Sequence, residues 1–197
     1  MEKPTGSEIS PLFISEMFGR YVNWKILLHF TRNPTREYYV NELSDSLKIG
    51  RGTASQSLRH LADIGLLERI ERANLRHYRL RDTLLSREIK RLYGIAVFCQ
   101  IQAGERIMEN EAVLSVALYG SYASGEWDHK SDVDLLLISD GSVDYTDVAC
   151  EVSEFLDAEV NVEVISSGAW LNLRGSKDVF YENVIRNHVI LAGGELP

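Results

Sequence analysis

The stretch GSYASGEWDHKSDVDLLL, residues 120–137, combines two short motifs that decide how the second half of the chain folds. A Gly-Ser pair opens it, ten mostly polar residues follow, and Asp132 and Asp134 then precede a purely apolar run. Continuous apolar residues are typical of a strand that is covered on both faces. Because charge is costly at the entrance of such a strand, the two aspartates need a partner.

The aspartate pair predicts a metal site. On an extended segment Asp132 and Asp134 project from one face, with their Cα atoms about 6.6 Å apart. Two like charges beside an apolar strand repel each other and are desolvated. A divalent cation relieves both effects, and carboxylate oxygens, waters and substrate phosphates are the ligands that magnesium prefers. We therefore predict that both aspartates bind Mg2+ or Mn2+.

Gly120 and Ser121 supply the complementary half of this site. Glycine lets the backbone approach a phosphate, while a serine hydroxyl and the amides of a helix start donate to phosphate oxygens. Acids that hold metal beside donors that hold a triphosphate form a site for nucleotidyl transfer. A paired-metal variant would activate an acceptor hydroxyl and stabilise the leaving pyrophosphate. The expected substrate or ligand is a nucleoside triphosphate, in the first instance ATP.

The surrounding pattern alternates strands with helices, which implies a small mixed sheet with helices packed on it. Trp127, in the loop between the two motifs, is a candidate for stacking on a base, and packing on the protein is the alternative. The expected elements are strands at 113–119, 133–139 and 160–166, a short turn and helix after residue 119, helices at 146–160 and 177–189, and a final apolar segment, VILAG.

The two motifs and the fixed gap between them resemble the minimal nucleotidyltransferase domain of the DNA polymerase β superfamily. The resemblance covers about residues 105–193 and includes GSYASG and SDVDLLL. It implies that Asp132 and Asp134 are catalytic metal ligands, and that Gly120 and Ser121 grip the β and γ phosphates.

Two positions depart from that family. Ser124 stands where the family often has an arginine, which removes a phosphate contact. The third metal-binding acid, usually an aspartate on a neighbouring strand, has no Asp here. We predict that Glu163 takes its place as metal ligand or base, because Asn161, Glu163 and Ile165 share one face of the strand VNVEVIS. The alternative is that Glu163 is an exposed residue without such a role.

A second pattern occupies the first half of the chain. In TASQSLRHLADI, residues 53–64, the apolar side chains Ala54, Leu58, Leu61 and Ile64 recur at helical intervals. Around this helix we expect a helix over 18–31, a β-prone piece at 38–40, a helix over 41–47 with Asn41 as N-cap, and strands at 66–71 and 76–81.

This order, carried by residues 39–81 and especially by TASQSLRHLADIGLLERI, resembles a winged helix-turn-helix of the ArsR/MarR regulator type. The resemblance implies double-stranded DNA as a partner and a role in transcription regulation, and a helix of this kind fits the major groove. A winged helix that contacts protein is the alternative. The predicted DNA-binding residues are Arg51, Thr53, Ser55, Gln56 and Arg59 on the helix, and Arg72 and Arg76 at the hairpin tip.

Charge divides the chain in the same way. Residues 18–82 hold 12 Lys or Arg and 7 Asp or Glu, a net +5, whereas residues 83–197 hold 8 and 19, a net −11. A basic module fused to an acidic one suggests two different partners. We expect an α+β chain of two domains, with the winged helix-turn-helix at 15–82, a connecting helix at 83–111 and the nucleotidyltransferase fold at 112–197.

The connector has a wide apolar arc over residues 83–113, and it reads as one long helix or two abutting ones. Gly94 and Gly104 each weaken it by about 1 kcal/mol, so kinks are expected there. Part of the arc should pack on the C-terminal module, and part is available to pair two chains as a homodimer. A monomer is the alternative.

Three functions fit these patterns. The first is a DNA-binding regulator that transfers a nucleotidyl group to an unknown acceptor. The second is a catalytically inactive sensor, in which a bound nucleotide changes DNA affinity. The third is an antitoxin-type transferase that modifies a partner RNase toxin, with a protein as acceptor. We expect a cytoplasmic protein without a membrane partner. Its two cysteines have no metal or redox spacing, no apolar run is long enough to span a membrane, and the sequence shows no signal peptide.

Overall fold

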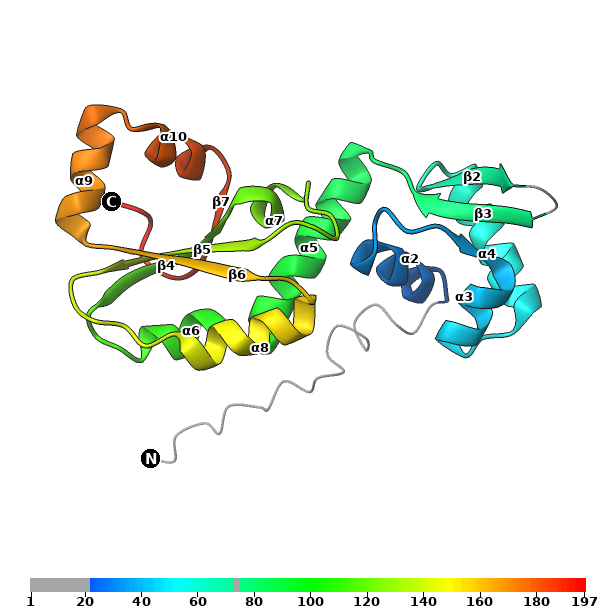
Figure 1. Cartoon of the computed structure of the whole chain (residues 1–197), viewed down its shortest axis with the longest axis horizontal. Coiled ribbons are helices and arrows are strands. Elements are labelled where there is room, and N and C mark those ends of the chain that lie inside the picture. Colours follow the sequence, from blue (N-terminus) through cyan, green and yellow to red (C-terminus); the bar gives the residue numbers. More distant parts are fainter. Residues whose placement is uncertain (1–21, 73–74) are drawn as a thin grey trace, which may run out of the picture.

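The computed structural model describes residues 22–72 and 75–197 of the 197-residue chain. It contains two sheets, each with its own helices, joined through one long helix (Figure 1). The expected mixture of helices and strands is confirmed. The predicted beginning of the first domain and two residues of the hairpin tip lie outside the described residues. Within those residues, no helix combines the length and the apolar character needed to cross a bilayer.

Within the described residues, the N-terminal part packs three helices against a small antiparallel sheet with strand order β1-β3-β2. Its apolar side chains recur at helical spacing and meet in one buried cluster that includes Ile26, Phe30, Leu43, Leu58 and Tyr78. The elements are α2 (Val22–Arg32), β1 (Tyr38–Tyr39), α3 (Val40–Leu47), α4 (Arg51–Asp63), β2 (Leu67–Arg72) and β3 (Leu75–Leu80).

Helix starts in this part differ from the expected ones by one or two residues. Helix α3 begins at Val40, with Tyr39 at the N-cap and no side-chain cap, so the prediction that Asn41 caps it is wrong. Helix α4 begins at Arg51, directly after Gly50. These helices therefore start without a capping side chain, and the buried apolar face of each helix supplies the stabilisation instead.

The connector is two abutting helices, α5 (Leu84–Gln100) and α6 (Ala103–Met108). They meet at Gln102, whose backbone is left-handed with φ 52°, and not at either glycine. A capping box fixes the start of α5: the amide of Ser86 donates to Oγ1 of Thr83 at 3.2 Å, and the amide of Thr83 donates to Oγ of Ser86 at 2.9 Å. The junction between the two halves of the chain is therefore a well-ordered helix start.

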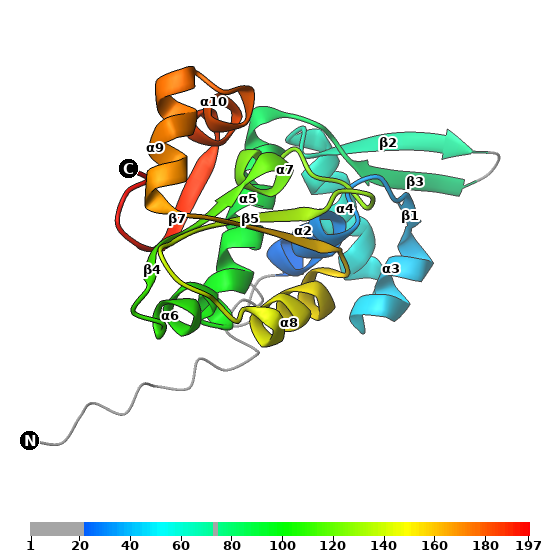
Figure 2. The same cartoon turned by 60° about the vertical axis from the view of Figure 1, so that its left-hand side comes forward.

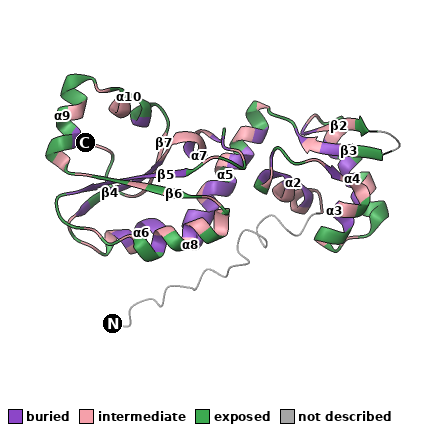
Figure 3. Ribbon diagram, in the orientation of Figure 1, coloured by how far each residue is buried: buried purple, intermediate pink, exposed green. Residues whose placement is uncertain are grey.

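The C-terminal sheet has strand order β6-β5-β4-β7. Strands β5 and β6 are parallel, whereas β4 is antiparallel to both β5 and β7. Figure 3 shows that buried residues concentrate in the two central strands, while the outer strands are more exposed. The strands are β4 (Val113–Tyr119), β5 (Val133–Ser139), β6 (Val160–Ile165) and β7 (His188–Gly193).

Helices cover both faces of this sheet (Figure 2). One face packs on α5, α6 and α8 (Thr146–Leu156) through side chains such as Val97, Val152 and Leu135. The other face packs on α9 (Ser167–Ser176) and α10 (Val179–Arg186) through Trp170 and Val184. The short helix α7 (Gly120–Ser124) connects β4 to the loop that leads into β5. Strand β5 thus lies between two helical layers, as its apolar sequence predicts.

Candidate active site

The end of β4 and the start of β5 lie side by side because the two strands are antiparallel and Tyr119 pairs with Asp134. Gly120 follows immediately, with φ 69°. A Cβ atom at this glycine would overlap with Oδ2 of Asp134. Only a residue without a side chain, in this left-handed conformation, lets the backbone pass so close to the carboxylate.

The carboxylates of Asp132 and Asp134 lie on the same side of the chain. Nδ2 of Asn161, on the neighbouring strand β6, is 3.4 Å from Oδ2 of Asp132 and 3.4 Å from Oδ1 of Asp134. One amide group can reach both acids only if their oxygens converge. The structure therefore brings together Gly120 and the two aspartates, residues that stand twelve to fourteen positions apart in the sequence.

Burial disfavours the charged form of Asp134. Burial raises the pKa of Asp134; the hydrogen bond from Asn161 lowers it, and the charge of Asp132 raises it further. Burial also raises the pKa of Tyr119 to about 12, and the charges of Asp134 and Glu163 add to that shift. Negative potential thus accumulates at this edge of the sheet, which favours a bound cation.

Glu163 lies on β6, opposite Leu136 of β5 and two residues beyond Asn161. Its side chain is exposed. Among the residues that the structure describes, no three His, Cys, Asp or Glu side chains come together as a metal site. The structure therefore does not bring Glu163 into a three-carboxylate group with Asp132 and Asp134, and its role as a third ligand or base stays a prediction.

Ser121 and Ser124 lie on the first turn after β4. The hydroxyl of Ser124 donates to the carbonyl oxygen of Ser121 at 3.2 Å and lies 3.5 Å from Oε2 of Glu126. Within the described part of the chain, the hydroxyl of Ser121 has no hydrogen-bond partner. It is therefore available to a ligand, whereas the residue at the position where arginine is expected is engaged within the loop.

A family model described as "Polymerase beta, Nucleotidyltransferase" matches residues 102–193. The match covers less than half of the chain, and it shows that the C-terminal part is similar to this family. The matched range contains the Gly-Ser turn, the two aspartates and the four-stranded sheet. The expected limits, residues 105–193, agree with the matched range within three residues.

Three solved structures are similar to part of the chain. One is a "possible transcriptional regulator from Methanosarcina mazei Go1", with 18% identity and a TM-score of 0.33, covering 50% of this chain and 85% of that chain. A toxin-antitoxin with AMP-PNP has 20% identity and a TM-score of 0.31, with 46% and 70% covered. A mutant of the toxin-antitoxin MntA-HpeT has 17% identity and a TM-score of 0.33, with 50% and 74% covered. No curated protein matches the chain. Similarity this low assigns no function.

Trp127 lies within the matched range but apart from the Gly120 and Asp134 site. Its side chain is 3% exposed, and its ring stacks on Tyr122 with the centroids 4.8 Å apart. Of the two alternatives for Trp127, the structure shows packing on the protein, since the ring is buried against Tyr122. Asn161 is the site residue whose contact with both aspartates was missed. Its strand pattern placed it on the correct face, but the pairing of Asp134 with Asn161 depends on a register that one sequence does not give.

The candidate nucleic-acid face lies on α4, outside the range that the family model matches. The side chains of Arg51, Thr53, Gln56 and Arg59 are exposed there, and Ser55 is half-buried. The guanidinium of Arg59 donates to the carbonyl oxygen and hydroxyl of Ser55, both at 3.2 Å. The opposite face of the helix is buried. The helix therefore presents a polar and basic surface to solvent.

The arginines of the hairpin are less available to DNA than those of α4, because acidic side chains lie close to them. Arg72 pairs with Glu37 at 2.8 Å, and Arg76 lies 3.8 Å from Glu71. Both arginine side chains are well exposed, but their charges are partly offset by the acidic neighbours. DNA binding by this hairpin and by α4 stays a prediction.

Proposed function

We propose that the chain transfers a nucleotidyl group from a nucleoside triphosphate to an acceptor hydroxyl, using its C-terminal domain. One observation carries this proposal: Gly120 packs against the Asp134 carboxylate, while the amide of Asn161 reaches both Asp132 and Asp134. A turn that could approach phosphates and a pair of acids that could hold a metal lie together at one edge of the sheet. The match of residues 102–193 to a nucleotidyltransferase family supports the same reading.

The donor set suits Mg2+ or Mn2+ because it consists of carboxylate oxygens that converge beside an apolar strand. Asp132 and Asp134 would hold the ion, and Glu163 is the proposed third ligand or base. When bound, such a cation offsets the charge of the triphosphate and of the leaving pyrophosphate. Waters and phosphate oxygens complete the coordination in sites of this kind.

The chain's own residues would position the substrate. The backbone of Gly120 would leave space for the β and γ phosphates of the nucleotide, and the hydroxyl of Ser121 would donate a hydrogen bond to them. We propose that the nucleotide is ATP. The acceptor oxygen forms a bond to the α phosphorus, the bond from that phosphorus to the bridging oxygen breaks, and pyrophosphate leaves. The proton of the acceptor hydroxyl passes to a base, for which Glu163 is the proposed residue.

We further propose that the N-terminal part, within residues 15–82, is a winged helix-turn-helix that binds double-stranded DNA, and that residues 83–111 connect it to the C-terminal domain at 112–197. The exposed face of α4, which includes Arg51 and Arg59, supports this function because arginines neutralise phosphates and short polar side chains can reach base edges.

A nucleotide sensor without catalysis is a second candidate. Ser124 is hydrogen-bonded within its loop where an arginine is expected, and no third acid joins the aspartate pair among the described residues. A site of this kind can bind a nucleotide and still lack the full set of groups for transfer. In an antitoxin-type version of the first proposal, the acceptor would be a partner RNase toxin.

Transfer is tested by incubating the protein with Mg2+ and α-labelled ATP, with the protein itself, DNA, RNA and a cell extract offered in turn as acceptors. We expect label on one acceptor for the wild type and at least a hundredfold less for Asp132→Asn/Asp134→Asn. Asp147→Asn, at an exposed position of α8, is the matched control and should keep the wild-type rate. Nucleotide binding without any labelled product would contradict the transfer proposal and favour the nucleotide sensor without catalysis.

A further inference from the structure

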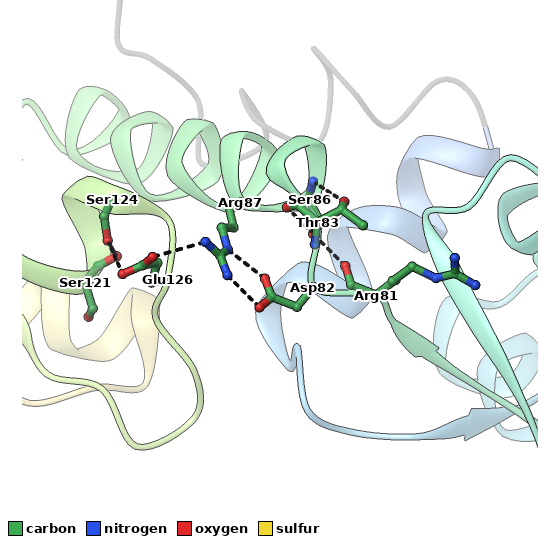
Figure 4. A network of polar contacts seen from close by, with 8 residues as sticks. All are labelled: Arg81, Asp82, Thr83, Ser86, Arg87, Ser121, Ser124 and Glu126. Carbon is green, nitrogen blue, oxygen red and sulfur yellow. Dashed lines mark hydrogen bonds and ion pairs between the residues drawn. The ribbon is translucent and has the colours of Figure 1, made fainter.

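A cleft of about 560 Å³ lies between the two parts of the chain. Its walls come from the loop after α2, the end of β3, the first turns of α5 and the loop after α7, and they include Thr35, Arg81, Lys90, Trp127 and Asp128. Figure 4 shows one side of this junction, where the side chain of Arg87 reaches from α5 toward Asp82 and toward Glu126 of the loop after α7. Any occupant of the cleft would thus contact both parts of the chain.

Lys90 is the unusual residue of this cleft. Its side chain is 7% exposed, and its ammonium has neither a hydrogen bond nor an ion pair with any residue that the structure describes. The ring of Trp127 has its centroid 5.4 Å from Nζ, and the charges of Asp82, Asp128 and Glu126 act favourably on the ammonium from farther away. A cation–π contact replaces only part of the hydration that an ammonium loses when its side chain is buried.

Trp127 adds a second unused donor. Its side chain is 3% exposed, and its Nε1 has no hydrogen-bond partner in the described part of the chain. Buried indole N–H groups usually find an acceptor. Lys90 and Trp127 therefore both line the cleft, and the indole N–H has no acceptor among the described residues.

The acidic side chains of the cleft are already engaged. Glu68 pairs with Arg79 at 2.5 Å, while Asp82 and Glu126 share Arg87 at 2.8 and 3.2 Å. Asp128 accepts the amide of Lys130 at 2.9 Å and lies 3.4 Å from the hydroxyl of Ser131. None of these carboxylates forms an ion pair with Lys90. The ammonium of Lys90 therefore has no direct carboxylate partner in the cleft and is available to an acceptor from outside the chain.

We propose that this cleft binds a small ligand through an oxyanion, phosphate or carboxylate, with Lys90 and Trp127 as the donors and Arg81 at the rim. Oxyanion oxygens accept from both kinds of donor, and charge-assisted hydrogen bonds to an ammonium are strong. The cavity volume lies within the range of small-molecule sites. The cleft shares no residue with the Gly120 and Asp134 site, so this ligand site does not depend on the proposed transferase activity.

The indole resonances of the ¹⁵N-labelled full chain test the site, because only Trp24, Trp127 and Trp170 contribute and Trp127→Phe assigns the relevant peak. Inorganic phosphate and citrate are the two probes, without added metal. We expect the Trp127 peak to move on saturation with at least one of them, while the other two peaks stay. Movement with phosphate alone supports a phosphate ligand, and movement with citrate alone supports a carboxylate.

Lys90→Met keeps the length of the side chain and removes the charge, so we expect at least a tenfold loss of affinity for the active probe. Unchanged Trp24 and Trp170 peaks would show that this variant folds. Ser121→Ala and Lys130→Met should both keep the wild-type affinity. Ser121 belongs to the proposed nucleotide site, so a loss of affinity in Ser121→Ala would mean that the probe binds there and not in the cleft. Lys130 is exposed and controls for the loss of one lysine charge. A Trp127 peak that ignores both probes, or moves equally in Lys90→Met, would overturn the proposal.

Discussion

A methyl group on Gly120 would enter space that the carboxylate of Asp134 occupies. The ideal Cβ overlaps with Oδ2 and lies 3.3 Å from Cγ of that aspartate. The backbone of Gly120 also has φ 69°, a conformation that residues with side chains rarely adopt. Gly120→Ala therefore perturbs the local backbone and one of the two acids, and it leaves the charge of the site unchanged.

The expected loss of stability is modest. The left-handed conformation costs alanine about 1–2 kcal/mol, and turning the Asp134 side chain out of its rotamer costs about 1 kcal/mol. The alanine also restricts the unfolded chain, which offsets about 0.4–1 kcal/mol. The net loss is about 1–2 kcal/mol in the free energy of unfolding. A displaced metal ligand should weaken binding of the magnesium nucleotide at least tenfold, since about 1.4 kcal/mol corresponds to a factor of ten.

Urea unfolding followed by circular dichroism measures the first quantity, and calorimetric titration with Mg2+ and the analogue AMP-PNP measures the second. Gly168→Ala is the matched control, because no atom lies within 4 Å of a Cβ there and the residue is within α9. It should gain up to about 1 kcal/mol and keep its affinity. Wild-type nucleotide affinity in folded Gly120→Ala would refute the reasoning.

Three further predictions concern charge. Burial raises the pKa of Asp134, so its ionised form destabilises the fold at a pH above that pKa. Asp134→Asn should therefore be more stable than the wild type at pH 7 and lose this advantage at pH 3. Urea unfolding at both pH values measures the difference. Burial lowers the pKa of Lys90, so wild-type stability should rise as the pH increases through that lowered pKa toward 10.5, and Lys90→Met should lack this rise. Arg59→Ala should weaken binding to double-stranded DNA and reduce the salt dependence of log affinity by about one unit in fluorescence anisotropy, whereas Arg174→Ala, on α9, should change neither.

The sequence predicts the central strands and the site motifs well because their signals are local. Five apolar residues mark the segment 133–139, and the strand has those limits in the structure. The same is true of 113–119. In contrast, the contact of Gly120 with Asp134 depends on the antiparallel pairing of these strands, which no local pattern specifies.

Other features required the tertiary structure. Helix α9 was not predicted, since Trp170 is its one buried residue and a single apolar contact gives no periodicity. The break between α5 and α6 falls at Gln102 and not at a glycine, so local propensity was a poor guide to it. Lys90 looks like an ordinary helix residue in the sequence, and Trp127 was predicted only to stack on a base or to pack on the protein. Their positions in the cleft at the junction make them candidates for binding an oxyanion.

Titration of the protein with a nonhydrolysable nucleoside triphosphate, with and without Mg2+, tests the central claim most directly. We predict binding that requires the metal and that disappears in both Asp132→Ala and Asp134→Ala, while Asp147→Ala behaves as the wild type. Equal affinity in the presence and absence of metal, or wild-type affinity in folded variants that lack either aspartate, would contradict the assignment of this pair as a metal and nucleotide site.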